Sequence, residues 1–223
     1  LRRDFRDGNT GVGVLATGVN RDLGNPLFDG LRRDAYAGGV DFFHRFAANQ
    51  WSLSGTLSGS RISGDADAIT AAQRSSARYY QRPDQDYVKL DPTATSMTGW
   101  ASSLSVGKIA GAWTIATDFF AQSPGFEVND AGFSTEADDI FHGIIGSRRW
   151  LDPGDVFRRF TVSSSFAQTW NFGGVNTSQS VYLGANGQLL NYWSFNLSGS
   201  YILRTLSDAT TRGGPLMTRP RAW

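Results

Sequence analysis

The stretch WSLSGTLSGSRIS, residues 51–63, decides the fold of this chain. Its first ten residues alternate strictly between large or apolar positions and small polar ones. In an extended strand, successive side chains point to opposite faces, so the two kinds of residue separate. One face carries Trp51, Leu53, Gly55, Leu57 and Gly59, and the other carries Ser52, Ser54, Thr56, Ser58 and Ser60. The stretch therefore predicts a strand between an apolar environment and an aqueous one.

Similar alternation recurs along the 223 residues. After a strand tail over residues 1–5, we expect nine strands over residues 10–21, 34–46, 51–63, 96–108, 112–122, 137–150, 156–171, 177–189 and about 193–203. Turn signals separate them, such as Asp7-Gly8 and Pro153-Gly154. This spacing predicts an antiparallel up-and-down meander. In the strand over 137–150, Ile144 and Ile145 compete for the apolar face, and the pattern leaves both assignments open.

The links between the expected strands are alternately long and short. Long links are expected over 22–33 (with Gly24, Pro26 and Gly30), 64–95 and 123–136, with a glycine-rich link over 172–176 and a final loop over 205–223. The first half of the 64–95 surface loop is compatible with a short helix over 67–80. In a meander, all these links lie on one rim, and the short turns lie on the other.

The tryptophans follow this division between the rims. Trp51, Trp113, Trp150 and Trp193 stand beside short turns, and Trp100 and Trp170 lie toward the long links. Aromatic side chains gather at both membrane interfaces of transmembrane barrels, so we interpret these six as membrane-interface residues. No apolar run is long enough for a membrane helix. The sequence predicts an all-β, antiparallel, up-and-down transmembrane β-barrel in the bacterial outer membrane, with outer-membrane lipid as its partner.

The expected organisation is a single barrel domain over 1–223. Single-chain bacterial barrels have an even number of strands, so nine to ten strands suggest a fragment truncated at both ends. A soluble antiparallel barrel or sandwich is the alternative, because such folds also alternate. The long strands, the Ser/Thr/Gly composition of the polar face and the tryptophans at strand ends favour the membrane.

Composition narrows the classes of partner and cofactor. The formal net charge is +1, which provides no general attraction to nucleic acid. The chain has no cysteine, so a disulfide framework and a thiolate metal site are both excluded. His44 and His142 are the only histidines, and they are expected near opposite rims. We therefore expect no cofactor and no metal.

Several segments resemble a bacterial outer-membrane β-barrel domain of unknown function that follows an N-terminal module similar to family 9 carbohydrate-binding modules. The matching pieces are RDFRDGNT (3–10), AAQRSSARYYQRPD (71–84), SPGFEVNDAGF (123–133), NFGG (171–174), NYW (191–193) and RGGPLMTRP (212–220). The resemblance implies an outer-membrane protein whose preceding module binds sugar. It also implies that a hydrolase label, where used, belongs to that module.

Two sets of residues could carry a function. The 64–95 link combines aromatic and charged side chains at Arg74, Arg78, Tyr79, Tyr80, Arg82, Asp84 and Asp86. Aromatic rings stack on sugars while Arg and Asp bind hydroxyls, so a glycan site is one interpretation. The favoured one is a loop folded into the barrel mouth as a plug held by Arg–Asp pairs.

The second set consists of the carboxylates Glu127, Asp130, Asp138 and Asp139. Paired carboxylates can catalyse glycoside hydrolysis or bind Ca²⁺, but charge at the rim of a loop is the more common role. Glu127 and Asp130 join the candidate ligand-binding residues, and no catalytic residue is assigned.

The expected function is passage or surface capture of a polar solute, carbohydrate included. The first alternative is a carbohydrate-active hydrolase whose catalytic or binding module lies outside this fragment. The second is a soluble sugar-binding β-domain. The chain itself is not expected to be an enzyme.

Overall fold

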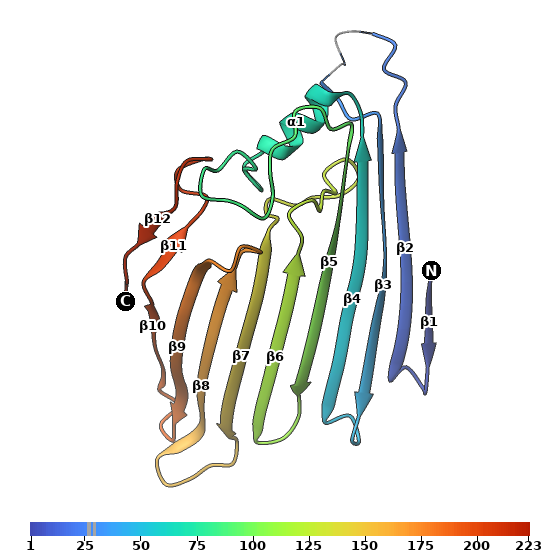
Figure 1. Cartoon of the computed structure of the whole chain (residues 1–223). Helices are drawn as coiled ribbons and strands as arrows, with labels where there is room; N and C mark the ends of the chain where they lie inside the picture. The colour runs from blue at the N-terminus through green and yellow to red at the C-terminus, as the bar shows by residue number, and fades with distance from the viewer. Residues whose placement is uncertain (26–27, 29) are drawn as a thin grey trace.

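The computed structural model describes all residues except 26, 27 and 29. These described residues form a ten-stranded antiparallel sheet in which every strand pairs with its neighbours in sequence (Figure 1). The strands are β1 Arg2–Phe5, β2 Thr10–Asn20, β3 Asp34–Phe46, β4 Trp51–Ser63, β5 Ser96–Lys108, β6 Trp113–Gln122, β7 Asp139–Trp150, β8 Phe157–Trp170, β9 Asn176–Leu189 and β10 Ser194–Ile202. The predicted all-β meander is confirmed.

The strand register sorts the side chains into two faces. Residues opposite each other on neighbouring strands share a face, and Val14, Val40 and Leu57 are joined in this way across β2, β3 and β4. Leu104, Phe119 and His142 are joined likewise across β5, β6 and β7. We call this side the apolar face. On it the large side chains are substantially exposed, including those of Val12, Val40, Leu57, Leu104, Phe119, Ile144, Leu183 and Leu197.

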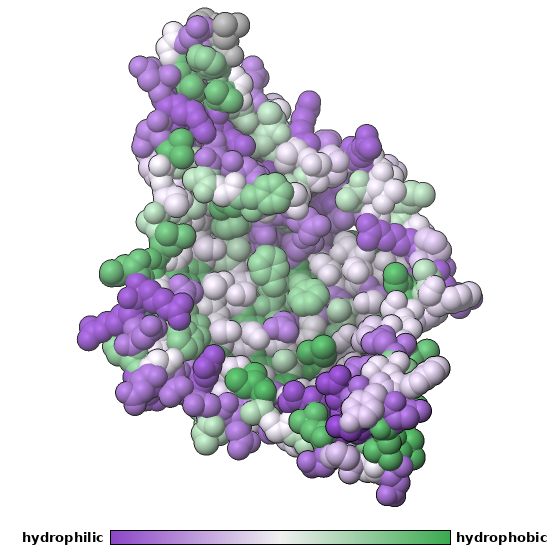
Figure 2. Space-filling model, turned by 180° about the vertical axis from the view of Figure 1, so that it is seen from behind, coloured by the Kyte–Doolittle hydropathy of each residue, from purple (hydrophilic) through white to green (hydrophobic). Residues whose placement is uncertain are grey.

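The opposite side, the polar face, carries mainly Ser, Thr and Gly. Examples paired across β7, β8 and β9 are Ser147 with Ser163, and Ser165 with Tyr182. A few larger side chains, such as Leu15 and Ile145, also stand here. Figure 2 looks onto a hollowed face of the molecule, where residues of intermediate hydropathy prevail in the middle and hydrophilic ones gather at the rims. The alternation in the sequence therefore gives the sheet one face of large apolar side chains and one face of small polar ones.

The rim with the short turns carries a series of stacked rings. Phe46 stacks on Trp51, and Trp51 meets the ring of Trp113 edge-on at 6.5 Å. Further along, Phe160 lies 5.6 Å from Trp150 and 6.2 Å from Phe195. Aromatic pairs in these arrangements attract beyond their area of contact. The tight turns therefore stand beside a belt of aromatic side chains on the apolar face.

The links of the opposite rim fold over the polar face. The helix α1, Ala66–Arg74, buries Ile69 and Ala72 against Ile62 of β4 and Met97 of β5. Gly99 of β5 lies directly against the 123–138 link, because an added Cβ on Gly99 would clash with the backbone of Gly125 and Phe126. Only glycine permits this close approach of link and sheet. The hydrophobic cluster thus lies between the links and the upper part of the polar face.

Three details differ from the sequence-based expectations. The helix is shorter than 67–80, because the chain leaves the helix at Ser75 and the Arg78 side chain caps the Ala72 carbonyl at 2.9 Å. The 205–223 segment is not a plain loop, because β11 Thr205–Ser207 pairs with β12 Met217–Arg219. The link between β8 and β9 covers only residues 171–175, so it is as short as the turns of the other rim, which have four to six residues.

The structure also decides between the two isoleucines of β7, whose assignment the sequence left open. Ile144 pairs with Thr117 and Phe166, which puts it on the apolar face and Ile145 on the polar face. Both histidines stand on the apolar face, His44 bonded to Thr10 and His142 to Thr117 and Gln168. Pro26, expected in the first long link, lies outside the described residues.

The sheet is open in the described residues, because β1 and β10 form its two edges and do not pair with each other. At the β10 edge, the backbones of Ile202 and Ala222 exchange two hydrogen bonds of 2.8 and 3.1 Å. The described residues contain no helix with the length and apolar character needed to cross a membrane.

Candidate functional site

Two buried arginines of the 64–95 link, Arg78 and Arg82, organise the long-link rim. Arg78 donates to the Glu127 carboxylate at 2.9 Å and to the backbone carbonyls of Phe126 and Pro124 at 2.7 and 3.0 Å. The side chains of Arg78 and Glu127 are 2% and 4% exposed. The guanidinium therefore fastens the 64–95 link to the 123–138 link through charge-assisted bonds, which are stronger than neutral ones.

Glu127 extends this contact to a third link. Its carboxylate lies 3.1 Å from the Arg32 guanidinium, which also approaches Asp130 at 3.2 Å. Arg21 reaches Asp130 at 2.7 Å. The Glu127 backbone amide donates to Ser60 Oγ of β4 at 2.9 Å. We call Arg21, Arg32, Arg78, Glu127 and Asp130 the first ion-pair network.

Arg82 makes the centre of a second ion-pair network with Asp138 and Asp208. Its guanidinium lies 3.1 Å from the Asp138 carboxylate and 2.8 Å from that of Asp208, which precedes the turn between β11 and β12. Tyr87 donates to Asp138 and accepts from Arg82. Asn171, in the link between β8 and β9, donates to Asp208 at 2.9 Å. This network joins the rim to the β11–β12 hairpin.

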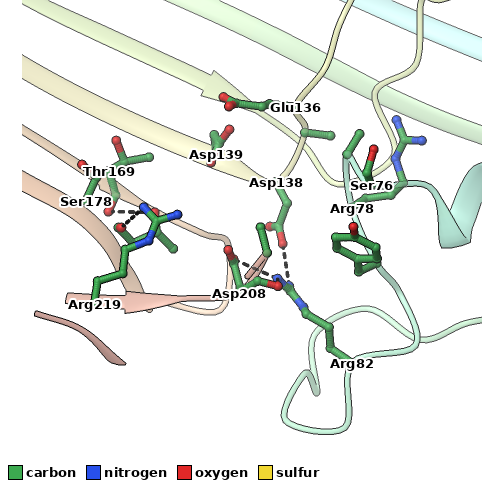
Figure 3. A pocket seen from close by; sticks show the side chains of 15 residues that line it. Ser76, Arg78, Arg82, Glu136, Asp138, Asp139, Thr169, Ser178, Asp208 and Arg219 are labelled. Atoms are coloured by element: carbon green, nitrogen blue, oxygen red, sulfur yellow. Dashed lines mark hydrogen bonds and ion pairs between the residues drawn. The ribbon is translucent and has the colours of Figure 1, made fainter. Parts of the chain in front are cut away.

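A polar pocket of about 330 Å³ opens beside the second network (Figure 3). Arg82, Asp138 and Asp208 form one part of its wall, with their ion pairs drawn as dashed lines. Further polar groups come from Glu136 of the 123–138 link and from Asp139, Thr169, Ser178 and Arg219 of β7, β8, β9 and β12. Arg219 donates to the Thr177 carbonyl at 3.3 Å and forms no ion pair with a described residue. The pocket therefore presents hydroxyl, carboxylate and guanidinium groups on its walls.

The sequence-predicted ligand residues are not brought to one surface. Arg78, Arg82 and Glu127 are buried in ion pairs, and Asp130 is bound by Arg21 and Arg32. Arg78, Tyr79 and Arg82 line the pocket. Tyr80 packs against the hydrophobic cluster, Asp84 accepts from the Leu216 amide, and Arg74 is exposed at the helix end. Their ligand-binding role stays a prediction, and the contacts favour the plug interpretation.

The carboxylates suggested for catalysis or calcium lie in different surroundings. Glu127 and Asp130 belong to the first network and Asp138 to the second, so arginines already neutralise them. Asp139 lines the pocket. No group of acidic or histidine residues in the described part of the chain has an arrangement suited to a metal ion.

Sequence reasoning missed several members of the networks. Arg21, Arg32, Tyr87, Asn171 and Asp208 were not selected, although each lies in or next to a link of the same rim. Arg82 and Asp208 are 126 residues apart in sequence, so no local pattern connects them. Asn171 belonged to one of the segments that carry the family resemblance, which was the one available signal.

For the acidic groups of the two networks, burial raises the pKa and hydrogen bonds to the carboxylate lower it. Burial raises the pKa of Tyr80 to about 12. Burial also raises the pKa of Asp138, and its hydrogen bonds to Tyr87 and Phe172 only partly offset this. For Glu127, burial acts upward, but the Asn129 amide and the charges of Arg78 and Arg32 outweigh it, so its pKa is lowered.

Lowering the pH should therefore protonate Glu127 and remove its ion pairs with Arg78 and Arg32. A carboxylate with a lowered folded-state pKa contributes stability that is present above its unfolded pKa and lost as pH falls through the folded value. We expect Glu127→Gln to be less stable than wild type at pH 7, with the difference shrinking below about pH 4.5. Urea unfolding of both proteins between pH 7 and pH 3 measures this. A difference that does not change with pH would contradict the assignment.

Together, the fold and site define an antiparallel sheet protein whose long links are locked by buried ion pairs around a polar pocket on one rim. Comparison with family models matches residues 23–209 to the family described as Domain of unknown function (DUF5916). The chain belongs to this family. No curated protein and no solved structure gives a significant match.

Proposed function

We propose that this domain is the wall and plug of a bacterial outer-membrane β-barrel that captures or passes a polar solute. The observation that carries the proposal is the apolar face. It extends over β2 to β10 with many exposed large side chains, and the hydrophobic cluster that the links bury lies on the opposite, polar face. Soluble monomers rarely expose contiguous apolar patches larger than a few hundred Å². Lipid is the environment that such a face fits.

The positions of the aromatic and charged side chains support this orientation. Trp51, Trp113 and Trp150 belong to the stacked rings at the short-turn rim, and Trp100 and Trp170 stand toward the other end of their strands. Charged residues on the apolar face stand near strand ends, namely Arg3, Asp34, Arg61, Lys108 and Arg148. Charges are least costly near the membrane interfaces, so this distribution suits a membrane-spanning wall.

The free edges support closure into a barrel. Among the described residues, the outer edges of β1 and β10 pair with no further strand of the sheet, and backbone groups must be satisfied inside a bilayer. Ala222 forms an isolated antiparallel bridge with Ile202 on the outer edge of β10. We infer that further strand pairing closes the wall, with the polar face toward the lumen.

The links at the rim support solute capture at the mouth. Both ion-pair networks hold the links over the polar face, and the pocket lies where those links meet the upper ends of β7, β8 and β9. Its hydroxyl, carboxylate and guanidinium groups suit hydroxyl-rich solutes, carbohydrates included. The hydrolase alternative has less support, since Glu127 and Asp130 are held by arginines.

The test uses the full-length gene product in its native host membrane and after purification. We expect it in the outer-membrane fraction, with a gel mobility that changes on heating. In liposomes, swelling with small neutral sugars would support passage, and saturable binding of those sugars without swelling would support surface capture. Recovery in the soluble fraction would overturn the membrane proposal. A folded membrane protein with neither swelling nor binding would overturn the solute proposal.

A further inference from the structure

The β11–β12 hairpin, residues 205–219, forms one wall of the polar pocket. Asp208, Ala209 and Arg219 line the pocket from the hairpin, and the rest of the wall comes from the links and from β7, β8 and β9. In Figure 3, the ion pair between Asp208 and Arg82 joins the hairpin to the opposite wall. A movement of the hairpin away from the links would therefore open the pocket.

The hairpin leaves the sheet at a point where its own ladder is interrupted. Ile202 pairs with Ala222, and pairing resumes in the same register at Thr205 and Arg219. Between these two pairs stands Pro220, which has no N–H to donate to the opposite strand. The two chain segments leave the sheet side by side and can bend together there, so this interruption has the geometry of a hinge.

Polar contacts hold the hairpin against the rim. Among the described residues, the hydrophobic cluster under the links contains no residue of the hairpin. Leu206 and Met217 are 37% and 50% exposed, and the side chains that the hairpin does bury, Thr205 and Ser207, are polar. Segments with few buried apolar contacts open at a lower free energy than the rest of a fold. The hairpin is therefore the wall of the pocket best suited to move.

The ion pair of Asp208 is the contact that keeps the hairpin closed. Its carboxylate lies 2.8 Å from the Arg82 guanidinium, and the two side chains are 18% and 5% exposed. A further contact, from the Leu216 amide to Asp84, lies at an exposed position of the link. Arg82 also binds Asp138 at 3.1 Å. Loss of the bond to Asp208 therefore leaves Arg82 paired and the 64–95 link in place.

We propose that the β11–β12 hairpin is a hinged lid of the polar pocket, closed by the Arg82–Asp208 ion pair and able to open while the links stay in place. The lid rests on the proposed function, because it controls entry to the pocket that captures the solute. When the hairpin bends away at the Pro220 interruption, its part of the pocket wall moves with it. The plug keeps its position, because Arg82 stays bound to Asp138.

Cysteine labelling measures this opening, because the chain has no cysteine of its own. Thr205→Cys places a thiol between hairpin and sheet, since Thr205 is 6% exposed and its hydroxyl donates to the Thr177 carbonyl of β9 at 3.3 Å. Ser60→Cys is the matched control on β4, since Ser60 is 7% exposed and accepts from the Glu127 amide. Each thiol is labelled with N-ethylmaleimide in the full-length protein without solute, and the labelled peptide is quantified by mass spectrometry.

Asp208→Asn removes the charge of the ion pair and keeps the shape of the side chain. We expect it to speed the labelling of Thr205→Cys about tenfold, because a charge-assisted bond that favours the closed lid is lost. Labelling of Ser60→Cys should stay unchanged, because the first network remains intact. Asp86→Asn is the matched control for charge. Asp86 is exposed on the 64–95 link and forms no ion pair with a described residue, so both labelling rates should match wild type.

Amide hydrogen exchange shows which segment moves. In Asp208→Asn, residues 205–219 should exchange faster than in wild type, while residues 76–90 keep the wild-type rates. Equal labelling of Thr205→Cys in Asp208→Asn and Asp86→Asn would overturn the lid. A parallel rise at both thiols would also overturn it, because the whole rim would then open together. Sugar binding and swelling are measured separately, so a failed lid and a failed solute proposal are distinguishable.

Discussion

Arg82→Ala is expected to lower the free energy of unfolding by about 3–5 kcal/mol, the largest effect of any single substitution considered. Removing one partner of a buried ion pair leaves the other charge uncompensated in a poorly solvated place. Here two carboxylates lose their cation, Asp138 at 3.1 Å and Asp208 at 2.8 Å. Tyr87 and Gln85 also lose their hydrogen bonds to Arg82. The substitution should therefore release the 64–95 link from the hairpin.

Urea unfolding and hydrogen exchange measure this together. We expect faster amide exchange in residues 76–90 and 205–219, while the middle of β3 to β8 stays protected. Arg74→Ala is the matched control, since Arg74 is exposed and precedes the same loop. An Arg82→Ala protein as stable as Arg74→Ala would show that the second network does not hold the rim. The double variant with Asp138→Ala should lose less than the sum of the two single variants, because the two residues interact directly.

Leu104→Arg is expected to destabilise the protein in lipid vesicles by about 2–4 kcal/mol. Leu104 lies in the middle of β5 on the apolar face, paired with Gly55 and Phe119, and is 44% exposed. In a barrel this position faces hydrocarbon, where a guanidinium has no partner. In a soluble domain the same position faces water, and arginine there would cost little.

Ser105→Arg provides the comparison from the next residue. Ser105 stands on the polar face opposite Asp118, so an arginine there gains a carboxylate neighbour, in what the proposed barrel makes an aqueous lumen. We expect it to change stability by less than about 1 kcal/mol, because isolated ion pairs in solvated surroundings contribute little. Folding into phosphatidylcholine vesicles at increasing urea measures both variants. Equal stability of the two proteins would indicate that water contacts both faces.

The sequence allowed most of the sheet to be predicted. The boundaries of β3, β4 and β5 coincide with the predicted ones, and the other long strands differ at their ends by up to two residues. These strands are readable because alternation is a property of adjacent residues and needs no knowledge of partners. The β11–β12 hairpin was not predicted, since its three-residue strands are too short to show a period.

The sequence by itself determined the two faces of the sheet, the order of the strands and the rim on which the charged links lie. Only the tertiary structure decided which carboxylate each arginine binds, such as Arg21 with Asp130 across 109 residues and Arg82 with Asp208 across 126. It also decided that Ile144, and not Ile145, stands on the apolar face. Period and turn chemistry are local, whereas ion pairing and register depend on which segments the folded sheet brings together.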